Sequence, residues 1–182
     1  MHFKLKRGAF LDRDGVINET VLCNGINRPP NSTDEIIIID GVTDAIQILK
    51  ELRIIPIVVT NQPDVARGTA TQVDVNAINA KIMDLTGIQH VYTCFHDDLD
   101  NCLCRKPKPG LLLKAIEDLD IDLNKSFLVG DRWRDIEAGQ ILGLDSFFID
   151  NLNNEKIPNA PYTRVQSLFE AVNLIVRDTD DF

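Results

Sequence analysis

The stretch FLDRDGVIN, residues 10–18, joins an apolar run to two aspartates and a glycine. Asp12 and Asp14 are two residues apart, so in extended chain their side chains point to the same face of a strand. Gly15 then allows the backbone to turn away from the strand and to approach a ligand closely. The stretch therefore predicts a buried strand whose end presents two carboxylates to one place.

Apolar runs of strand length recur along the chain and alternate with helical patterns. The runs of the strand type are GAFLD (8–12), EIIIID (35–40), IIPIVVT (54–60), QHVYTCF (89–95), SFLVGD (126–131) and DSFFID (145–150). Apolar residues spaced at three and four predict helices over 42–53, 71–87, 110–120, 134–143 and 164–177. This alternation indicates the α/β class, with a doubly wound, mainly parallel, Rossmann-like sheet and helices on both faces. The run EIIIID can instead belong to a small hairpin, because no convincing helix separates it from the first strand.

The length and composition favour a single domain over residues 1–182. A chain of 182 residues that is 44% hydrophobic is long enough to bury one sizeable core. Residues 61–93 hold little more than one helix and one strand, so we expect a capless fold. Residues 19–34 form the longest irregular stretch, and loops of this length are often functional.

The net charge of −9 argues against nucleic acid and anionic membrane surfaces as partners, because both are bound by clustered Lys and Arg. No stretch approaches the roughly 20 apolar residues of a membrane span. The start, MHFKLKRGAF, leads directly into a strand rather than into the apolar region of a signal peptide. We therefore expect a cytoplasmic monomer whose partner is a small molecule held by a few local basic residues.

Polar side chains gather where the predicted strands end, namely Asp12, Asp14, Thr60, Asn61 and Asp131, with Lys106 in a loop. In open α/β sheets, ligands bind outside the carboxyl ends of the strands. Asp131 can join Asp12 and Asp14 as an oxygen ligand of Mg²⁺, which also relieves the repulsion between close carboxylates. A carboxylate can then attack phosphorus to form an aspartyl-phosphate, and its neighbour can protonate the leaving alcohol and later deprotonate water.

Each of these segments also has an ordinary structural explanation. An aspartate after a strand is often a helix cap or a turn residue. VVTNQ (58–62) can be a strand followed by an Asx turn, and RKPKPG (105–110) can be a solvated basic loop. Their common position at strand ends favours a functional site over these separate explanations.

The segment CFHDDLDNCLC (94–104) contains three cysteines and one histidine, which are Cys94, His96, Cys102 and Cys104. Three sulfurs and one imidazole match a closed tetrahedral zinc site, with no open position and hence a structural role. The alternatives are ordinary buried thiols beside a surface histidine, or a Cys102–Cys104 disulfide, which a reducing compartment disfavours. Because Arg105 and Lys106 follow Cys104 directly, zinc in this loop of residues 94–104 would fix the basic residues that follow it.

Four segments, FLDRDGVIN, VVTNQ, CRKPKPG and LVGDRWRDIEAG, resemble in order and approximate spacing the four motifs of the haloacid dehalogenase superfamily of phosphohydrolases. The resemblance implies that Asp12 is the nucleophile and Asp14 the general acid and base. It also implies that Thr60 and Lys106 hold the transferring phosphoryl group. By the same resemblance, Asp131 completes the Mg²⁺ site with Asp12 and the backbone carbonyl of Asp14.

Together with the zinc quartet, these motifs resemble a narrower zinc-bearing branch, which contains the D,D-heptose 1,7-bisphosphate phosphatases and the histidinol-phosphate phosphatases. The branch implies a phosphomonoesterase that uses Mg²⁺ and Zn²⁺ and acts on a small phosphorylated sugar. The favoured reaction is removal of the C7 phosphate of D-glycero-D-manno-heptose 1,7-bisphosphate. Histidinol phosphate or another small phosphorylated metabolite is the alternative, because the region between Asn18 and Gly41 departs from the heptose enzymes.

The expected substrate-binding residues are Arg13, Asn61, Gln62, Arg67 and Arg105. Arg13 is included although its side chain is expected on the face opposite Asp12, where it can pair with an acidic neighbour. The sequence pattern gives less definite roles for three further residues. Asp135 is a candidate to hold the loop or a metal-bound water, Arg28 is a candidate contact to a second phosphate, and Trp133 is expected to pack under the loop.

Two other classes of protein compete with the enzyme. A phospho-accepting domain of the receiver type also combines clustered carboxylates, Mg²⁺ and a lysine on a doubly wound sheet. It needs neither Asp14 as acid and base nor the zinc quartet. A non-catalytic zinc-stabilised binding module is the other rival, but the intact nucleophile argues against it, and fold alone never decides function.

Overall fold

Strand β1 (Arg7–Leu11) lies inside a six-stranded sheet in the computed structural model, which describes residues 5–23, 25–151 and 156–180. The strand order is β5-β4-β1-β6-β7-β8, and all neighbouring pairs are parallel. The remaining strands of this sheet are β4 (Ile54–Asn61), β5 (His90–Cys94), β6 (Phe127–Gly130), β7 (Asp145–Ile149) and β8 (Thr163–Val165). The predicted α/β class with a parallel sheet is confirmed. The expectation that the chain starts without a signal peptide concerns residues 1–10, and residues 1–4 of these lie outside the described ranges.

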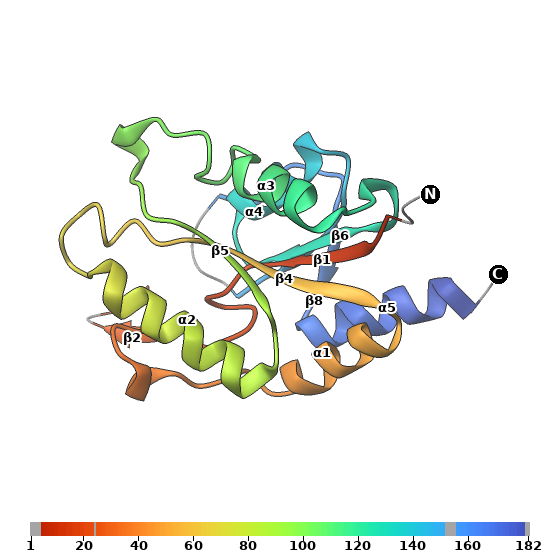
Figure 1. Ribbon diagram of the computed structural model, residues 1–182, viewed down its shortest axis with the longest axis horizontal. Coiled ribbons are helices and arrows are strands. Elements are labelled where there is room, and N and C mark those ends of the chain that lie inside the picture. The colour runs from red at the N-terminus through yellow and green to blue at the C-terminus, as the bar shows by residue number, and fades with distance from the viewer. Residues whose placement is uncertain (1–4, 24, 152–155, 181–182) are drawn as a thin grey trace.

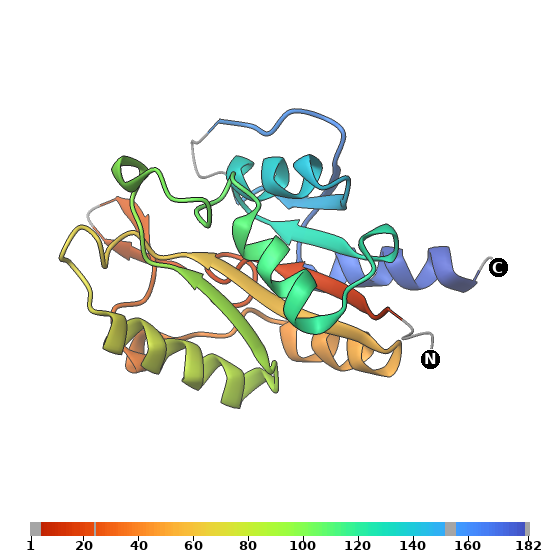
Figure 2. The same ribbon diagram turned by 45° about the horizontal axis from the view of Figure 1, so that its top comes forward.

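Helices cover both faces of the sheet (Figures 1 and 2). One face carries α1 (Val42–Glu51), α2 (Gln72–Thr86) and α5 (Leu168–Asp180). The other carries α3 (Gly110–Leu119) and α4 (Trp133–Ile141). The sheet is therefore doubly wound, as its alternating sequence pattern predicts.

The two hydrophobic cores follow from the alternation of side chains along each strand. In β1, Ala9 and Leu11 lie in the core under α1, α2 and α5, whereas Phe10 lies in the core under α3 and α4. Both faces are covered, so the strand is apolar at every one of these positions. Burying a leucine or phenylalanine side chain stabilises the fold by roughly 1.5–3 kcal/mol. The charged residues that follow Leu11 are therefore placed by a well-packed strand.

The segment EIIIID (35–40) does not form a strand of the sheet, so this part of the prediction is wrong. Ile38 makes an isolated antiparallel bridge with Asn18. Ile36, Ile38 and Ile39 pack partly buried against the first core, whereas Ile37 is exposed. Both edges of β1 are already paired with β4 and β6, which leaves no position beside it. The small hairpin lies earlier, within the stretch expected to be irregular, as β2 (Val21–Cys23) and β3 (Ile26–Arg28).

The edge strand β8 is absent from the prediction, which assigns residues 164 and 165 to the start of the last helix. Residues 163–165 pair with β7 instead, and α5 begins at Leu168. Short 3-10 helices occur at Thr33–Glu35, Asp98–Asp100 and Leu123–Lys125. Between β4 and β5 the chain holds α2, as the capless prediction requires. No helix within the described ranges is long and apolar enough to cross a membrane.

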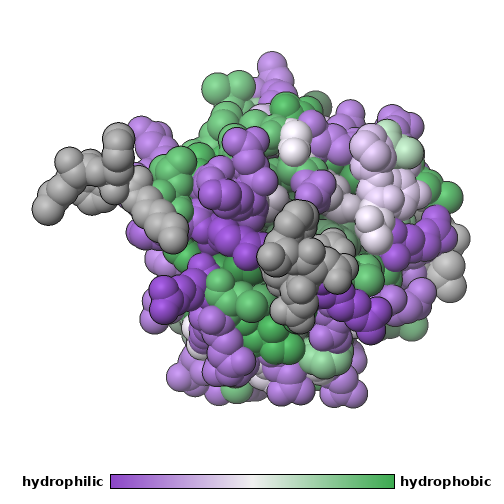
Figure 3. Space-filling model, turned by 90° about the vertical axis from the view of Figure 1, so that its right-hand side faces the viewer, coloured by the Kyte–Doolittle hydropathy of each residue, from purple (hydrophilic) through white to green (hydrophobic). Residues whose placement is uncertain are grey.

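The parallel register brings the polar strand ends to one edge of the sheet. Leu11 pairs with Val58 on one side and with Val129 on the other, so β1, β4 and β6 end side by side. The backbone N–H of Asp12 continues this pattern by donating to the carbonyl of Val129 at 3.0 Å. At the opposite end, where the strands begin, hydrophilic and hydrophobic side chains are interspersed (Figure 3).

Candidate active site and metal centres

The ammonium group of Lys106 is buried among oxygen atoms at the carboxyl ends of the strands. Its Nζ lies 2.6 Å from Asp12 Oδ1 and 2.6 Å from Asp135 Oδ1, and it donates to the carbonyl oxygen of Val59 at 2.6 Å. Burial by itself would lower the pKa of Lys106, but the two carboxylates outweigh burial and raise it. Lys106 is therefore a fixed positive charge beside the expected nucleophile.

Three buried carboxylates surround a single point of this site. One oxygen from each of Asp12, Asp131 and Asp135 lies within 4.8 Å of the others. Burial, with smaller contributions from the neighbouring acids, raises the pKa of Asp12 to about 6 despite Lys106. Burial together with the charges of Asp12 and Asp135 raises the pKa of Asp131 well above its ordinary value. Such crowding of negative charge requires a cation, and carboxylate oxygens are the ligands that Mg²⁺ prefers, so these residues fit a Mg²⁺ site.

The absence of a side chain at Gly15 leaves room for the carboxylate of Asp131 behind the end of β1. The φ of Gly15 is +87°, and a Cβ built on it would overlap the Oδ2 atom of Asp131. Gly130, at the end of β6, has the same relationship to Asp135, since a Cβ there would overlap that side chain. Both carboxylates therefore occupy space that only glycine leaves open.

Asp14 lies on the wall of the cavity above these carboxylates, with a side chain that is 14% exposed. Gln62 donates to Asp14 Oδ2 and to the hydroxyl of Thr60, both at 2.8 Å. Arg13 pairs with an acidic neighbour, Asp14, as expected, but it is fully buried and does not line the cavity where its substrate contact was expected. Gln62 and Thr60 are also buried and do not line it, so the substrate contact expected of Gln62 is replaced by hydrogen bonds to Asp14 and Thr60.

Asn61 connects the end of β4 to the loop that carries Lys106. Its Oδ1 accepts from the backbone N–H of Lys106 at 3.1 Å, and its Nδ2 donates to the backbone carbonyl of the same residue at 3.1 Å. Asn61 also lines the cavity. The side-chain amide of Asn61 therefore holds the backbone of Lys106 in place. The sequence pattern alone did not indicate this role.

The four expected zinc ligands lie together. Sγ of Cys104 is 3.2 Å from Sγ of Cys94, 3.4 Å from Sγ of Cys102 and 3.3 Å from Nδ1 of His96. A tetrahedral Zn²⁺ with bonds of about 2.3 Å to sulfur and 2.0 Å to nitrogen separates its ligands by roughly 3.5–3.8 Å. The donor set is complete and all cysteines of the group are free thiols, so these residues fit a structural Zn²⁺ rather than a disulfide.

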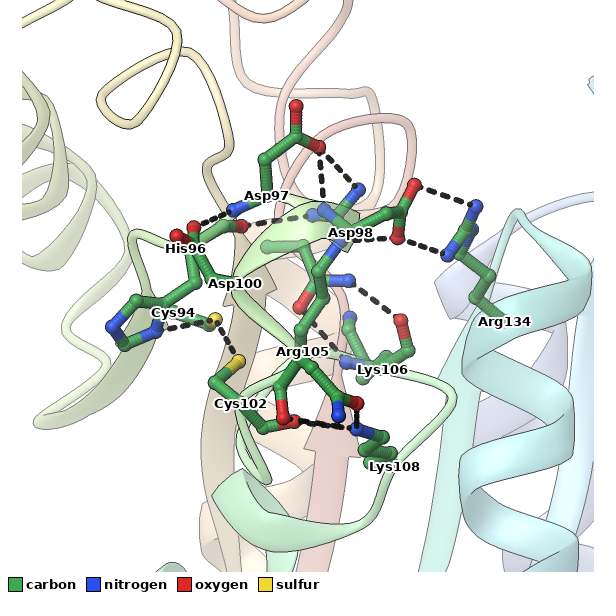
Figure 4. Close-up of polar contacts among 12 residues, drawn as sticks. Cys94, His96, Asp97, Asp98, Asp100, Cys102, Arg105, Lys106, Lys108 and Arg134 are labelled. Carbon is green, nitrogen blue, oxygen red and sulfur yellow. Dashed lines mark hydrogen bonds and ion pairs between the residues drawn. The ribbon is translucent and has the colours of Figure 1, made fainter.

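Two aspartates of the zinc-binding loop, Asp97 and Asp98, hold arginines from three segments, and Figure 4 shows two of these arginines, Arg105 and Arg134. Asp97 accepts two hydrogen bonds of 2.8 Å from Arg67, and these guanidinium contacts lower the pKa of Asp97 to about 2. Asp98 lies 2.8 Å from Nε of Arg105 and 2.9 Å from Nη1 of Arg134. Arg67 also lies 3.5 Å from Asp64, so a third carboxylate faces these guanidinium groups. We call Arg67, Asp97, Asp98, Arg105 and Arg134 the arginine cluster.

The cavity above Asp12 has a volume of about 300 Å³. The arginine cluster contributes Arg67, Arg105 and Arg134 to its wall, and Arg28 of β3 and Arg132 also line it. Arg28 is held by Glu35, whose two carboxylate oxygens accept its hydrogen bonds at 2.9 and 2.7 Å. The basic residues thus offset the overall acidity of the chain at this one place.

Arg132 and Arg134 were not among the expected substrate-binding residues. Their signal in the sequence is the run DRWRD at 131–135, in which basic residues follow a strand-end aspartate directly. Trp133, expected to pack under this loop, contacts cations instead. Arg134 lies 4.8 Å and Lys156 4.5 Å from the centre of its ring.

A family model described as haloacid dehalogenase-like hydrolase matches residues 7–143. The chain is 37% identical over 150 residues to the D-glycero-beta-D-manno-heptose-1,7-bisphosphate 7-phosphatase of Pasteurella multocida, covering 75% of this chain and 77% of that protein. It is 34% identical over 164 residues to the D-glycero-D-manno-heptose-1,7-bisphosphate 7-phosphatase of Chlorobaculum tepidum, covering 81% and 80%.

Among solved structures, the D,D-heptose 1,7-bisphosphate phosphatase of B. bronchiseptica, complexed with magnesium and phosphate, superposes with a TM-score of 0.80. It is 26% identical, and the match covers 94% of this chain and 99% of that one. The match of the family model covers most of the chain, and both curated relatives exceed 30% identity over more than two thirds of it. The chain belongs to the haloacid dehalogenase-like hydrolase family.

Proposed function

We propose that this protein is a Mg²⁺-dependent phosphatase that removes the C7 phosphate of D-glycero-D-manno-heptose 1,7-bisphosphate through an aspartyl-phosphate. The observation that carries the proposal is the contact of Lys106 with Asp12, in a cavity that also presents Asp14 and several arginines. The names and the coverage of the curated relatives support the choice of substrate.

In the first half-reaction, a carboxylate oxygen of Asp12 attacks phosphorus and forms the P–O bond of the aspartyl-phosphate. The bond from phosphorus to the sugar oxygen breaks, and Asp14 gives its proton to that oxygen. Lys106 stabilises the negative charge of the transferring group, whereas Thr60, which is buried off the cavity wall, would act by holding Gln62 against Asp14. In the second half-reaction, the carboxylate of Asp14 takes a proton from water as the water oxygen attacks phosphorus, which releases phosphate and restores Asp12.

The Mg²⁺ would be held by Asp12, Asp131 and the backbone carbonyl of Asp14, with Asp135 as a further carboxylate beside them. When bound, the ion supplies charge neutralisation between the anionic nucleophile and the anionic phosphoryl group. Lys106, with its Nζ 2.6 Å from Asp12 Oδ1, would supply a second positive charge at the nucleophile.

The arginine cluster is the proposed contact for the phosphate that stays on the sugar. Guanidinium groups bind phosphate with paired, charge-assisted hydrogen bonds. Arg67, Arg105 and Arg134 line the same cavity as Asp12, and Arg28 and Arg132 add two further guanidinium groups to its wall. A monophosphate such as histidinol phosphate would bring no second phosphate group to these arginines, so the cluster favours a bisphosphate.

The zinc-binding loop is proposed to have a structural role. It carries Asp97 and Asp98 and leads directly into Arg105 and Lys106, so a closed zinc site would hold both the arginine cluster and the catalytic lysine in place. Free thiols suited to zinc are typical of a reducing compartment, in keeping with a cytoplasmic location, and we further propose a single domain that acts as a monomer. Size-exclusion chromatography with light scattering tests the last point.

The test of the function is a comparison of phosphate esters with the purified, Mg²⁺-loaded protein. We expect kcat/KM for heptose 1,7-bisphosphate to exceed that for histidinol phosphate and for p-nitrophenyl phosphate by at least about tenfold, which corresponds to about 1.4 kcal/mol of transition-state binding. The Asp12→Asn variant is the control and should be folded and inactive. Preference for histidinol phosphate would transfer the proposal to that substrate. A stable phospho-Asp12 without turnover would favour a receiver.

A further inference from the structure

Arg13 has the largest fully buried side chain in the described part of the structure, with 0% of its surface exposed. It directly follows Asp12, yet it does not line the cavity. A buried guanidinium costs several kcal/mol of desolvation unless charged and polar partners compensate for it. The partners of Arg13 therefore indicate why the chain keeps a cation behind its active site.

The guanidinium of Arg13 donates hydrogen bonds to the carboxylate of Asp14 and to the side-chain amide of Asn79. Nε and Nη2 donate to Asp14 Oδ1 at 3.2 and 3.1 Å, and Nη2 also donates to Asp14 Oδ2 at 3.0 Å. Nη1 donates to Asn79 Oδ1 at 2.8 Å. Asn79, buried on α2, in turn donates from Nδ2 to the hydroxyl of Thr93 on β5 at 3.1 Å. Side chains of α2 and β5 thus hold the far side of the Arg13 guanidinium, while its other side holds the carboxylate of Asp14.

The other contacts of Asp14 come from buried side chains as well. Asn18 donates to Oδ1 at 3.0 Å, and Gln62 donates to Oδ2 at 2.8 Å. Both carboxylate oxygens are therefore anchored, and the carboxyl plane is set by the planar fork of Arg13. The small exposed part of Asp14 lies on the wall of the cavity.

We propose that Arg13, locked by Asn79, is a positioning residue that orients the carboxyl group of Asp14 for proton transfer to the leaving oxygen of the substrate. This rests on the proposed function, in which Asp14 is the acid of the first half-reaction. A proton moves from Asp14 to the sugar oxygen as the P–O bond breaks, so the transfer requires the carboxyl oxygen to point at that atom. Arg13 itself touches neither substrate nor phosphorus.

The role predicts a dependence on the leaving group that a purely structural role does not. An alkoxide needs a proton as it leaves, whereas p-nitrophenolate is stable without one. The comparison uses kcat/KM, which reports the step up to transfer of the phosphoryl group to Asp12 and not the later hydrolysis shared by all substrates. For Arg13→Met we expect kcat/KM for the sugar phosphate to fall roughly 10²-fold more than kcat/KM for p-nitrophenyl phosphate, a typical contribution of general acid catalysis.

The variants Asn79→Ala and Arg13→Lys complete the series. Asn79→Ala keeps the ion pair and frees the guanidinium at its far side, so we expect a smaller loss with the same leaving-group preference. Arg13→Lys keeps the charge without the planar fork and should recover only part of the activity toward the sugar phosphate. If Arg13→Met does not fold, as judged by circular dichroism, these two variants carry the test.

A double-mutant cycle with Asp14→Asn connects the two residues directly. If Arg13 acts through Asp14, then Arg13→Met should cause no further selective loss in the Asp14→Asn background. Equal losses for both esters in all folded variants, or additive losses in the cycle, would overturn the inference and leave the phosphatase standing. Absence of activity toward every ester in the unmodified protein would instead refute the proposed function.

Discussion

The side chain of Asn61 and the backbone of Lys106 form a closed pair of hydrogen bonds, both 3.1 Å long. The pair joins the end of β4 to the segment that follows the zinc-binding loop. Two residues that are 45 positions apart are thereby held in one geometry, and the ammonium of Lys106 reaches Asp12 from there at 2.6 Å.

Replacing Asn61 by alanine is expected to lower kcat/KM by about 10- to 100-fold, because a shift of about 1 Å in a catalytic group can cost that much. The measurement is steady-state kinetics with the sugar phosphate and with p-nitrophenyl phosphate, and both should be affected since Lys106 serves both. Zinc content should be unchanged. Wild-type kinetics in the variant would show that Lys106 keeps its position without Asn61.

Removing zinc is expected to lower both the melting temperature and the activity. The quartet of Cys94, His96, Cys102 and Cys104 would lose its common partner, and the loop that presents Arg105 and Lys106 would gain conformational freedom. Chelation followed by Mg²⁺ alone should not restore activity, whereas Zn²⁺ together with Mg²⁺ should. Metal analysis of the intact protein should find about one zinc per chain, the stoichiometry of a closed four-ligand site.

Gly15→Ala is expected to impair Mg²⁺ binding and activity more than its effect on stability alone explains. The positive φ costs about 1–3 kcal/mol for a side chain, and the added methyl group would also displace the carboxylate of Asp131. Gly68→Ala is the matched control, because Gly68 has a φ of +74° and no atom within 4 Å of an added Cβ. Equal effects of the two substitutions on the Mg²⁺ dependence of kcat/KM would argue against the role of Asp131.

Arg134→Ala is expected to raise KM for a bisphosphate by about 10- to 100-fold, since a hydrogen bond to a charged group contributes about 1.5–3 kcal/mol. The value of kcat, and the kinetics with p-nitrophenyl phosphate, should change little, because Arg134 contacts Asp98 at the cavity wall and not the carboxylates around Lys106. Arg164→Ala, which removes an ion pair with Asp150 away from the cavity, is the control. A parallel loss with both esters would contradict a selective contact to the second phosphate.

The ion pair of Arg28 with Glu35 predicts a dependence of stability on pH. The hydrogen bonds from Arg28, and one from the backbone of Asn31, lower the pKa of Glu35 from 4.5 to about 2. A lowered carboxyl pKa stabilises the folded state above the ordinary pKa, and this stabilisation is lost as pH falls toward the folded value. The difference in unfolding free energy between wild type and Glu35→Gln should therefore be largest above pH 4.5 and should close toward pH 2.

Urea denaturation at a series of pH values measures this difference, and it should shrink in high salt because the pair is partly exposed. A difference that is independent of pH would show that Glu35 contributes through packing rather than through its charge.

Much of the fold and of the carboxylate site could be predicted from local patterns. An apolar run followed by Asp12 and Asp14 describes a buried strand with an acidic end, and the other strands repeat this arrangement. Because parallel strands present their carboxyl ends at one edge, the acids and Lys106 were expected to meet, and they do. The cysteine and histidine ligands lie within eleven residues, so their clustering also follows from the local chain.

Local sequence patterns mispredict a segment when its secondary structure depends on whether a sheet edge is free to pair with it. EIIIID has the composition of a strand, but both edges of β1 are occupied, and the run packs on the core instead. The residues of β8 look helical because they precede an amphipathic helix, and only the free edge of β7 makes them a strand. Pairing depends on which neighbours the completed sheet leaves open.

Spacing along short segments is enough to predict the class of fold, the acidic strand ends and the residues of the zinc-ligand set. The contacts between side chains follow from the folded chain. They hold Arg13 on Asn79, Asn61 on Lys106, and Asp98 between Arg105 and Arg134. Such contacts join segments far apart in the chain or depend on rotamers fixed by packing, and neither is encoded in the spacing of a single segment.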